Sequence, residues 1–278
     1  MSGMRWLGRK IGIVLWAAIL GFAIALIPQG LWSALVVANL RTGTAIPWAV
    51  PLMAILLWLM LLYLSGRWAP RRTSDTRRNS LRLRRISMRA FTWAVVAGAL
   101  SIVALDGLWI VMARMVRMPG SVLPDMSNYP RLTVVAMVTM GVLVSPICEQ
   151  AGIWGYCQTR LERNFRPWFA VLTSALIFGL LPHPPMQAAL LPKLLFFCLT
   201  GLTFSLMARL TNSILPGLVV HIGGILSFFV LVWPSDPARS LVPENGIDAW
   251  FAIDVAQVVV FAALAIVAFM RLPRVAAE

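Results

Sequence analysis

The chain has 278 residues, of which 60% are hydrophobic and 12% are charged, and its formal net charge is +14. Soluble domains carry roughly 25% charged residues, so this composition excludes an ordinary soluble protein and favours one whose solvent is largely lipid. No stretch is left over for a soluble domain of about 50 residues or more. We therefore predict an all-α fold, a polytopic membrane helix bundle of about eight transmembrane helices that forms a single integral membrane domain over residues 1–278.

The first apolar run, residues 11–37, follows Arg5, Arg9 and Lys10. A cleaved signal peptide has an apolar core of about 7–15 residues and a small-residue cleavage site. This run is longer, and further runs follow it. We expect a retained first span.

Seven further apolar runs follow in chain order. They cover residues 45–64, 91–112, 132–147, 168–181, 188–207, 214–233 and 250–269. Runs of about 20 residues cross the hydrocarbon core of a bilayer as helices. The fourth and fifth of the eight runs are short and end in proline-containing polar stretches. Such breaks are tolerated at membrane depth only where protein or a water-filled cavity surrounds them.

A basic segment, residues 67–89, separates the second and third runs and holds nine arginines, with Asp75 as its only acid. Aromatic residues for stacking on bases are scarce there, so we interpret it as a cytoplasmic loop near anionic lipid and expect no nucleic-acid partner. If the N-terminus lies in the cytoplasm, the eight runs place 18 basic residues on the cytoplasmic side of the membrane and five on the other side. This bias predicts a multi-pass protein of the plasma (inner) membrane with both termini in the cytoplasm.

The three cysteines, Cys148, Cys157 and Cys198, form no Cys-x-x-Cys pattern. Neither a disulfide framework nor a cysteine zinc site is indicated. We expect the thiols to pack as small apolar side chains.

Ionisable side chains within apolar runs or at their ends are candidates for function, because each costs roughly 2.5–3.5 kcal/mol at the centre of a membrane helix. They are Asp106, Glu149, His183, Lys193, His221 and Asp254. The chain has only two histidines, and both follow Glu149 in the sequence. We expect the two aspartates to pair with a neighbour or lie near an interface, and Lys193 to extend to the interface.

Glu149, His183 and His221 belong to the fourth, fifth and seventh predicted helices and could share one cavity. A carboxylate can act as a general base on water, and an imidazole can donate a hydrogen bond to the developing oxyanion. The same side chains could instead ligate zinc or another divalent metal with a fourth position open. No other cofactor is indicated.

Three motifs surround these side chains: the segment 149–156, the segment from Phe178 to His183, and the segment 221–225. In this order they resemble the Glu-Glu-x-x-x-Arg, Phe-x-x-x-His and His-x-x-x-Asn motifs of the CPBP family of intramembrane proteases. That family includes the CAAX-processing endopeptidase Rce and the bacteriocin-processing or immunity proteins of the Abi group. The resemblance implies a family-like catalytic core at about residues 132–233.

The resemblance also implies an activity. Glu149 would be the base that activates water, His183 its partner, and His221 an oxyanion donor. The protein would be an intramembrane endopeptidase acting on a membrane-tethered peptide or protein.

Four positions depart from the family pattern. Gln150 stands in place of the second glutamate, Trp154 in place of the arginine and Ile225 in place of the asparagine, and Pro182 is inserted before the histidine. These departures favour the alternative interpretation, a catalytically silent relative that acts as an immunity, scaffold or transport-accessory protein.

Overall fold

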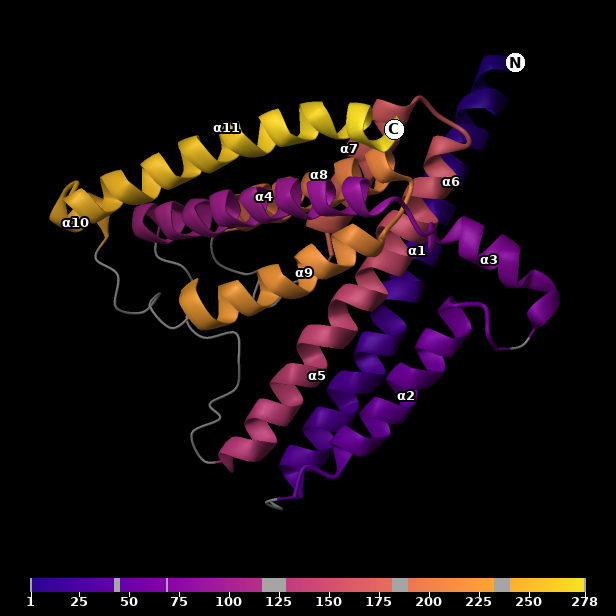
Figure 1. Ribbon diagram of the computed structural model, residues 1–278, viewed down its shortest axis with the longest axis horizontal. Coiled ribbons are helices and arrows are strands. Elements are labelled where there is room, and N and C mark those ends of the chain that lie inside the picture. Colours follow the sequence, from indigo (N-terminus) through magenta and orange to yellow (C-terminus); the bar gives the residue numbers. More distant parts are fainter. Residues whose placement is uncertain are drawn as a thin grey trace. The chain divides into compact units, whose positions relative to one another are not determined.

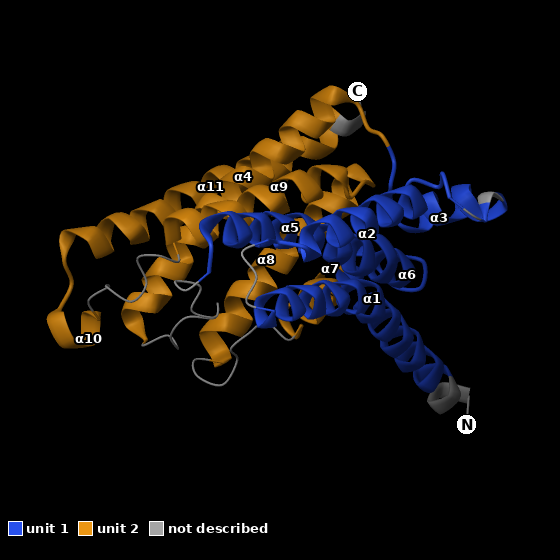
Figure 2. Cartoon of the chain, turned by 90° about the horizontal axis from the view of Figure 1, so that it is seen from below, with its two compact units in different colours: residues 1–84, 123–170 blue, residues 85–122, 171–278 orange. Residues whose placement is uncertain are grey.

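The computed structural model describes residues 2–42, 46–68, 70–116, 129–181, 190–232 and 241–277, and every regular element in these ranges is a helix (Figure 1). The chain divides into two compact units (Figure 2). Unit 1 comprises residues 1–84 and 123–170, and unit 2 comprises residues 85–122 and 171–278. The predicted all-helical, polytopic architecture is confirmed. The single membrane domain stays a prediction.

Unit 1 is built on two long helical stretches. The first is α1 (Ser2–Arg41), which is followed by α2 (Ala49–Leu64), a 3₁₀ turn (Arg71–Thr73) and the short α3 (Ser74–Ser80). The second begins as α5 (Arg131–Glu149), continues as the π-helix η2 (Gln150–Cys157) and ends as α6 (Gln158–Glu162). α1 packs against α5, η2 and α6.

Unit 2 is organised around α4 (Met88–Met115), which packs along α11 (Ala249–Ala277) and also contacts α8 (Leu190–Thr211) and α9 (Leu215–Ser227). The π-helix η3 (Phe228–Val232) extends α9, and α10 (Val242–Asn245) precedes α11. α7 (Pro167–Gly179) begins at the end of unit 1 and continues into unit 2.

In the part of the chain that the structure describes, six helical stretches are long and apolar enough to cross a membrane. They are Trp6–Arg41, Met88–Met115, Arg131–Glu162, Leu190–Thr211, Leu215–Val232 and Ala249–Val275. The other two predicted runs correspond to the shorter apolar helices α2 and α7, of 16 and 13 residues. An upright helix needs about 20 residues to cross the hydrocarbon. The chain is a multi-pass membrane protein, and the count of eight spans stays a prediction.

The fourth run does not end where the sequence predicts. Pro146 lies inside α5, and the helix continues through Glu149 to Glu162. Proline removes one backbone donor, but helices at membrane depth accommodate it because neighbouring groups and local changes of helix type satisfy the carbonyls that it frees. A change of helix type, η2, follows four residues after the proline.

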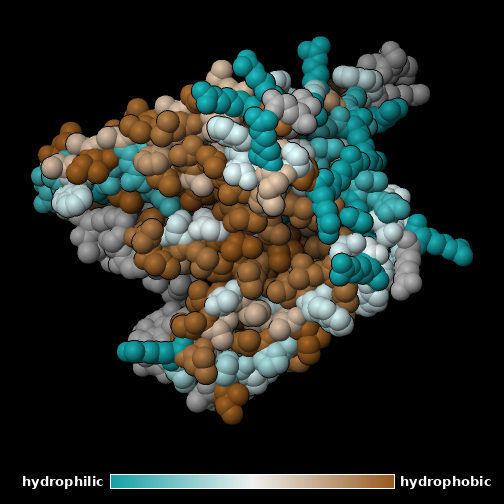
Figure 3. Space-filling view, in the orientation of Figure 1, coloured by the Kyte–Doolittle hydropathy of each residue, from teal (hydrophilic) through white to brown (hydrophobic). Residues whose placement is uncertain are grey.

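The flanks of the helices carry large exposed apolar side chains, among them Trp58, Leu191 and Leu231 (59%, 75% and 70% exposed). Hydrophobic residues cover much of the molecular face in Figure 3. Soluble proteins rarely expose apolar surface on this scale, whereas a bilayer accepts it.

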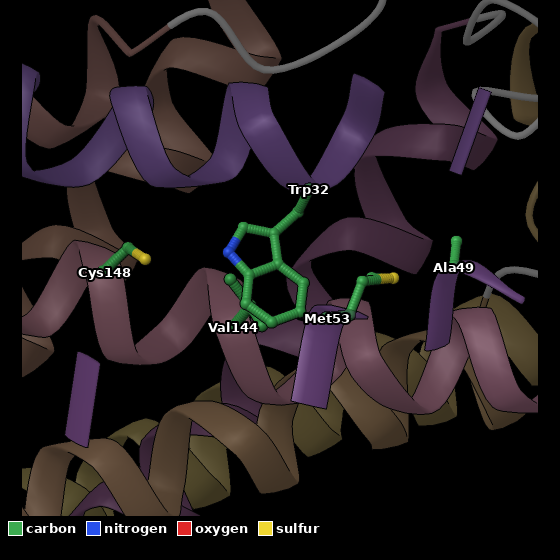
Figure 4. Close-up of a cluster of buried hydrophobic side chains, with 5 residues drawn as sticks. All are labelled: Trp32, Ala49, Met53, Val144 and Cys148. Atoms are coloured by element: carbon green, nitrogen blue, oxygen red, sulfur yellow. The ribbon is translucent and has the colours of Figure 1, made fainter. Parts of the chain in front are cut away.

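A cluster of buried side chains joins three helices of unit 1 (Figure 4). Trp32 of α1 packs with Met53 of α2 and with Val144 and Cys148 of α5. The Cys148 Sγ atom lies 3.8 Å from the sulfur of Met60. All three cysteines are free thiols, and the burial of Cys148 and Cys157 fits the predicted packing role.

α1 and η2 approach each other through glycines. A methyl group on Gly21 would lie 2.9 Å from Cβ of Cys157, and one on Gly152 would lie 2.9 Å from the backbone nitrogen of Ala25. Real side chains do not tolerate such distances, so only glycine allows this separation of the two helices. Small residues at helix crossings are a common packing device in membranes.

Replacing Gly152 by alanine is therefore expected to lower the free energy of unfolding by about 1–3 kcal/mol, because the added methyl group meets backbone atoms that cannot yield. The measurement is the thermal unfolding midpoint of the purified protein in detergent. Gly141→Ala in α5 is the matched control. A methyl group there meets nothing within 4 Å, and alanine is about 1 kcal/mol better than glycine inside a helix. Equal midpoints for the two variants would contradict the packing explanation.

In unit 2, an ion pair links the end of α4 to the start of α11. The buried Arg114 donates two hydrogen bonds to the carboxylate of Asp248, at 2.8 and 2.7 Å. Asp248 also accepts a hydrogen bond from the backbone nitrogen of Phe251, at 2.8 Å. The guanidinium hydrogen bonds, followed by the Phe251 N–H, lower the pKa of Asp248 from 3.8 to about 2.

The lowered pKa predicts a pH-dependent stability. A carboxylate with a depressed folded-state pKa stabilises the protein above its unfolded pKa, and this stabilisation is lost as pH falls through the folded value. Wild type should therefore unfold at a higher temperature than Asp248→Asn above pH 4, and the difference should vanish between pH 4 and 2. Thermal unfolding midpoints of wild type and Asp248→Asn, measured across this pH range, test the prediction. A difference between the two midpoints that does not change with pH would contradict it.

Candidate functional site

Glu149, the last residue of α5, is the best-defined candidate within the described chain. Its carboxylate is buried, and its Oε1 atom accepts hydrogen bonds from Ser145 Oγ at 2.7 Å and from Gln29 Nε2 at 3.1 Å. Ser145 lies one helical turn earlier on α5, whereas Gln29 reaches across from α1. Two donors on one oxygen fix the orientation of the carboxylate. A buried carboxylate held in this way is suited to act on a water molecule as a base.

Sequence reasoning did not identify Gln29 or Ser145. Gln29 is a polar side chain within the first apolar run, directly after Pro28, and this is the signal that could have found it. Ser145 precedes Glu149 by four residues, which places the two on the same helix face.

Gln150, the first residue of η2, is 1% exposed. Among the residues that the structure describes, neither its Oε1 nor its Nε2 atom has a hydrogen-bond partner. Leaving a buried amide unsatisfied costs about 1–3 kcal/mol. Gln150, the residue next to Glu149 in the chain, thus has a hydrogen-bond donor and an acceptor that no described residue pairs with.

Trp154 is completely buried in η2, at the position where the family pattern has arginine. A guanidinium in such surroundings would need a compensating charge, whereas the indole fills the space with mainly apolar surface. A π-helix is rare and often marks a functional site in a membrane or soluble helix. η2 follows Glu149 directly.

The basic segment 67–89 includes a buried arginine. Arg82 is 4% exposed and forms an ion pair with Glu162 at the end of α6. Gln158 donates a second hydrogen bond to the Glu162 carboxylate, at 2.9 Å. The backbone of Arg82 has a φ of 52°, in the left-handed region that a non-glycine residue rarely adopts.

His221 lies in α9 of unit 2 and is 6% exposed. Its ring stacks on Phe204 of α8, with 4.6 Å between centroids, and meets Phe178 of α7 edge-on at 6.3 Å. The phenylalanine of the second motif is thus in contact with the histidine of the third. Ile225 follows one turn later on α9 and is only partly buried.

The proposed convergence of Glu149, His183 and His221 stays a prediction. His183 and the inserted Pro182 lie outside the described residues, and Glu149 and His221 belong to different units. One carboxylate and two imidazoles form a donor set that zinc accepts. Among the described residues, no three His, Cys, Asp or Glu side chains form a group that could hold a metal ion.

Unit 2 also holds the other three charged candidates, Asp106, Lys193 and Asp254. Asp106 of α4 accepts a hydrogen bond from Ser227 Oγ at 2.9 Å, which is the expected pairing with a neighbour. Lys193 of α8 is 3% exposed, and its extension to the membrane interface stays a prediction.

Residues 131–224 match the family model described as Type II CAAX prenyl endopeptidase Rce1-like. The match starts at the first residue of α5 and ends inside α9, so it includes Glu149, His183 and His221 and stops one residue before Ile225. No curated protein and no solved structure matches the chain.

Proposed function

Because the chain belongs, through residues 131–224, to the CAAX-protease-like CPBP family, we propose that it is an intramembrane endopeptidase. The observation that carries this proposal is the buried carboxylate of Glu149, held by Ser145 and Gln29. The proposed substrate is a membrane-tethered peptide or protein of the CAAX type.

In the proposed mechanism Glu149 accepts a proton from a water molecule, whose oxygen attacks the carbonyl carbon of the scissile bond. The tetrahedral oxyanion accepts a hydrogen bond from the imidazole of His221. Glu149 then passes its proton to the leaving amine as the carbon–nitrogen bond breaks. His183 assists Glu149 in this scheme, and Gln150 offers a donor and an acceptor to the substrate backbone.

A catalytically silent relative is the second candidate function. It is favoured by the buried indole of Trp154 and by Gln150 and Ile225, which lack the charge or the donor of the family pattern. Such a protein would act through binding, as an immunity, scaffold or transport-accessory protein.

Cleavage of a prenylated, membrane-tethered peptide by the purified protein in liposomes tests the two functions. If the protein is an endopeptidase, wild type cleaves the peptide and His183→Ala does not. Glu244→Gln changes an exposed carboxylate of α10 and is the control, which should remain active. A chelator in the same assay tests a requirement for a divalent metal. No cleavage by wild type, together with an unchanged cellular phenotype of Glu149→Gln, would favour the silent relative.

We also propose that the protein resides in the plasma membrane with both termini in the cytoplasm, since the arginine-rich segments fall on one side in the eight-span arrangement. Reporter fusions after Arg85 and after Arg163 are expected to read cytoplasmic, and a fusion near Glu244 to read external. A reversed reporter at either arginine-rich segment would overturn this topology.

A further inference from the structure

Exposed arginines gather at the end of unit 1 that α3 and α6 form. They include Arg72, Arg78, Arg84, Arg160, Arg163 and Arg166. The acids described at this end are Asp75 and Glu162, and Glu162 is already paired with the buried Arg82. Hydrophilic side chains project from the region of α3 and α6 in Figure 3. This end therefore carries a large excess of positive charge.

The arginines are presented by a fixed backbone. Leu81 and Arg82 are buried, and a methyl group on Gly155 of η2 would lie 2.9 Å from the Leu81 carbonyl oxygen. Arg77 lies over the ring of Tyr63, 4.3 Å from its centroid, and donates to the carbonyl oxygen of Trp68 at 3.2 Å. A disordered loop would make none of these contacts.

The exposed arginines lie close in the sequence to the ends of apolar helices. α2 ends at Leu64, just before the basic segment, and α7 begins at Pro167, directly after Arg166. The indoles of Trp68 and Trp168 are exposed. Tryptophan is enriched at the level of the lipid headgroups, which favours a position of these arginines near the lipid phosphates.

We propose that this surface, called here the arginine surface and made of the exposed arginines of residues 72–84 and 160–166, binds the phosphate groups of anionic phospholipids. Guanidinium groups recognise phosphate oxygens with two parallel hydrogen bonds. The apolar flanks keep this end of the protein in the bilayer, so anionic lipid is the polyanion that adjoins it. The binding is independent of peptide cleavage.

Native mass spectrometry of the full-length protein in detergent, titrated with phosphatidylglycerol or phosphatidylcholine, measures this binding. The test variant is Arg78→Gln/Arg163→Gln. The matched control is Arg41→Gln/Arg131→Gln, which removes the same charge from exposed positions at the other end of α1 and α5. Basic residues near a membrane surface contribute about 1 kcal/mol each, or about fivefold in affinity, so the test variant should lose about 25-fold for phosphatidylglycerol.

Wild type and control variant are expected to prefer phosphatidylglycerol, with a preference that weakens as salt is added. Equal affinity of wild type for the two lipids, or equal losses in the two double variants, would overturn the proposal. Tighter binding of a single-stranded oligonucleotide than of phosphatidylglycerol vesicles, lost in Arg78→Gln/Arg163→Gln, would overturn it in favour of a nucleic-acid surface. None of these outcomes depends on endopeptidase activity.

Discussion

Replacing Glu149 by glutamine is expected to lower the rate of peptide cleavage by about 10²–10⁴-fold, because an amide cannot take the proton from water. The fold should survive the change. The amide oxygen of the new side chain can still accept hydrogen bonds from Ser145 and Gln29, the two donors that hold Oε1 in the native protein. Cleavage under single-turnover conditions, paired with a thermal unfolding scan, measures both consequences.

A matched variant distinguishes the contribution of the Glu149 carboxylate from that of the side chains that donate hydrogen bonds to it. Gln29→Leu keeps the carboxylate but removes one of the donors described above, so it should reduce cleavage less than Glu149→Gln does. Cleavage by Glu149→Gln within tenfold of wild type, with an unchanged midpoint, would exclude Glu149 as the base.

Replacing Arg82 by leucine is expected to lower the free energy of unfolding by about 3–5 kcal/mol, because it leaves the largely buried carboxylate of Glu162 without its counter-ion. The side chains of Arg82 and Glu162 are only 5% and 10% exposed. The double variant Arg82→Leu/Glu162→Leu removes both charges and should recover most of the loss. Chemical or thermal unfolding of wild type, Arg82→Leu, Glu162→Leu and the double variant in one detergent completes the cycle.

Arg78→Leu is the control for this cycle, since Arg78 belongs to the same segment but is exposed. Exposed substitutions usually change stability by about 0.5 kcal/mol or less. An effect of Arg82→Leu no larger than that of Arg78→Leu would show that the ion pair does not hold the basic segment.

The helical architecture could be predicted because a helix that faces lipid must be apolar over a length that spans the hydrocarbon. The apolar runs therefore coincide with helices such as α1 and α4. The end of α5 could not be predicted. Pro146 is a strong signal for a helix end in water, but in this chain the helix changes to π-helix and continues.

Part of the candidate site was equally open to prediction. Glu149 and His221 are ionisable residues at the end of an apolar run and inside one, respectively, and the structure buries both. Gln29 is neutral, lies 120 residues from Glu149 in the sequence, and depends on the packing of α1 on α5. Arg82 is one of nine arginines in its segment, and nothing in its immediate sequence distinguishes it from its exposed neighbours.

The π-helix η2 sets the angular phase between the two ends of one continuous helix. Each π turn takes up one residue more than the α turn it replaces, so η2 offsets α6 in rotation relative to α5. Glu149 can thus face Gln29 of α1 while Glu162, thirteen positions later, faces Arg82. Deleting one residue from η2 would rotate everything beyond it by about 100°. The carboxylate of Glu149 would keep its neighbours, and that of Glu162 would turn away from its counter-ion.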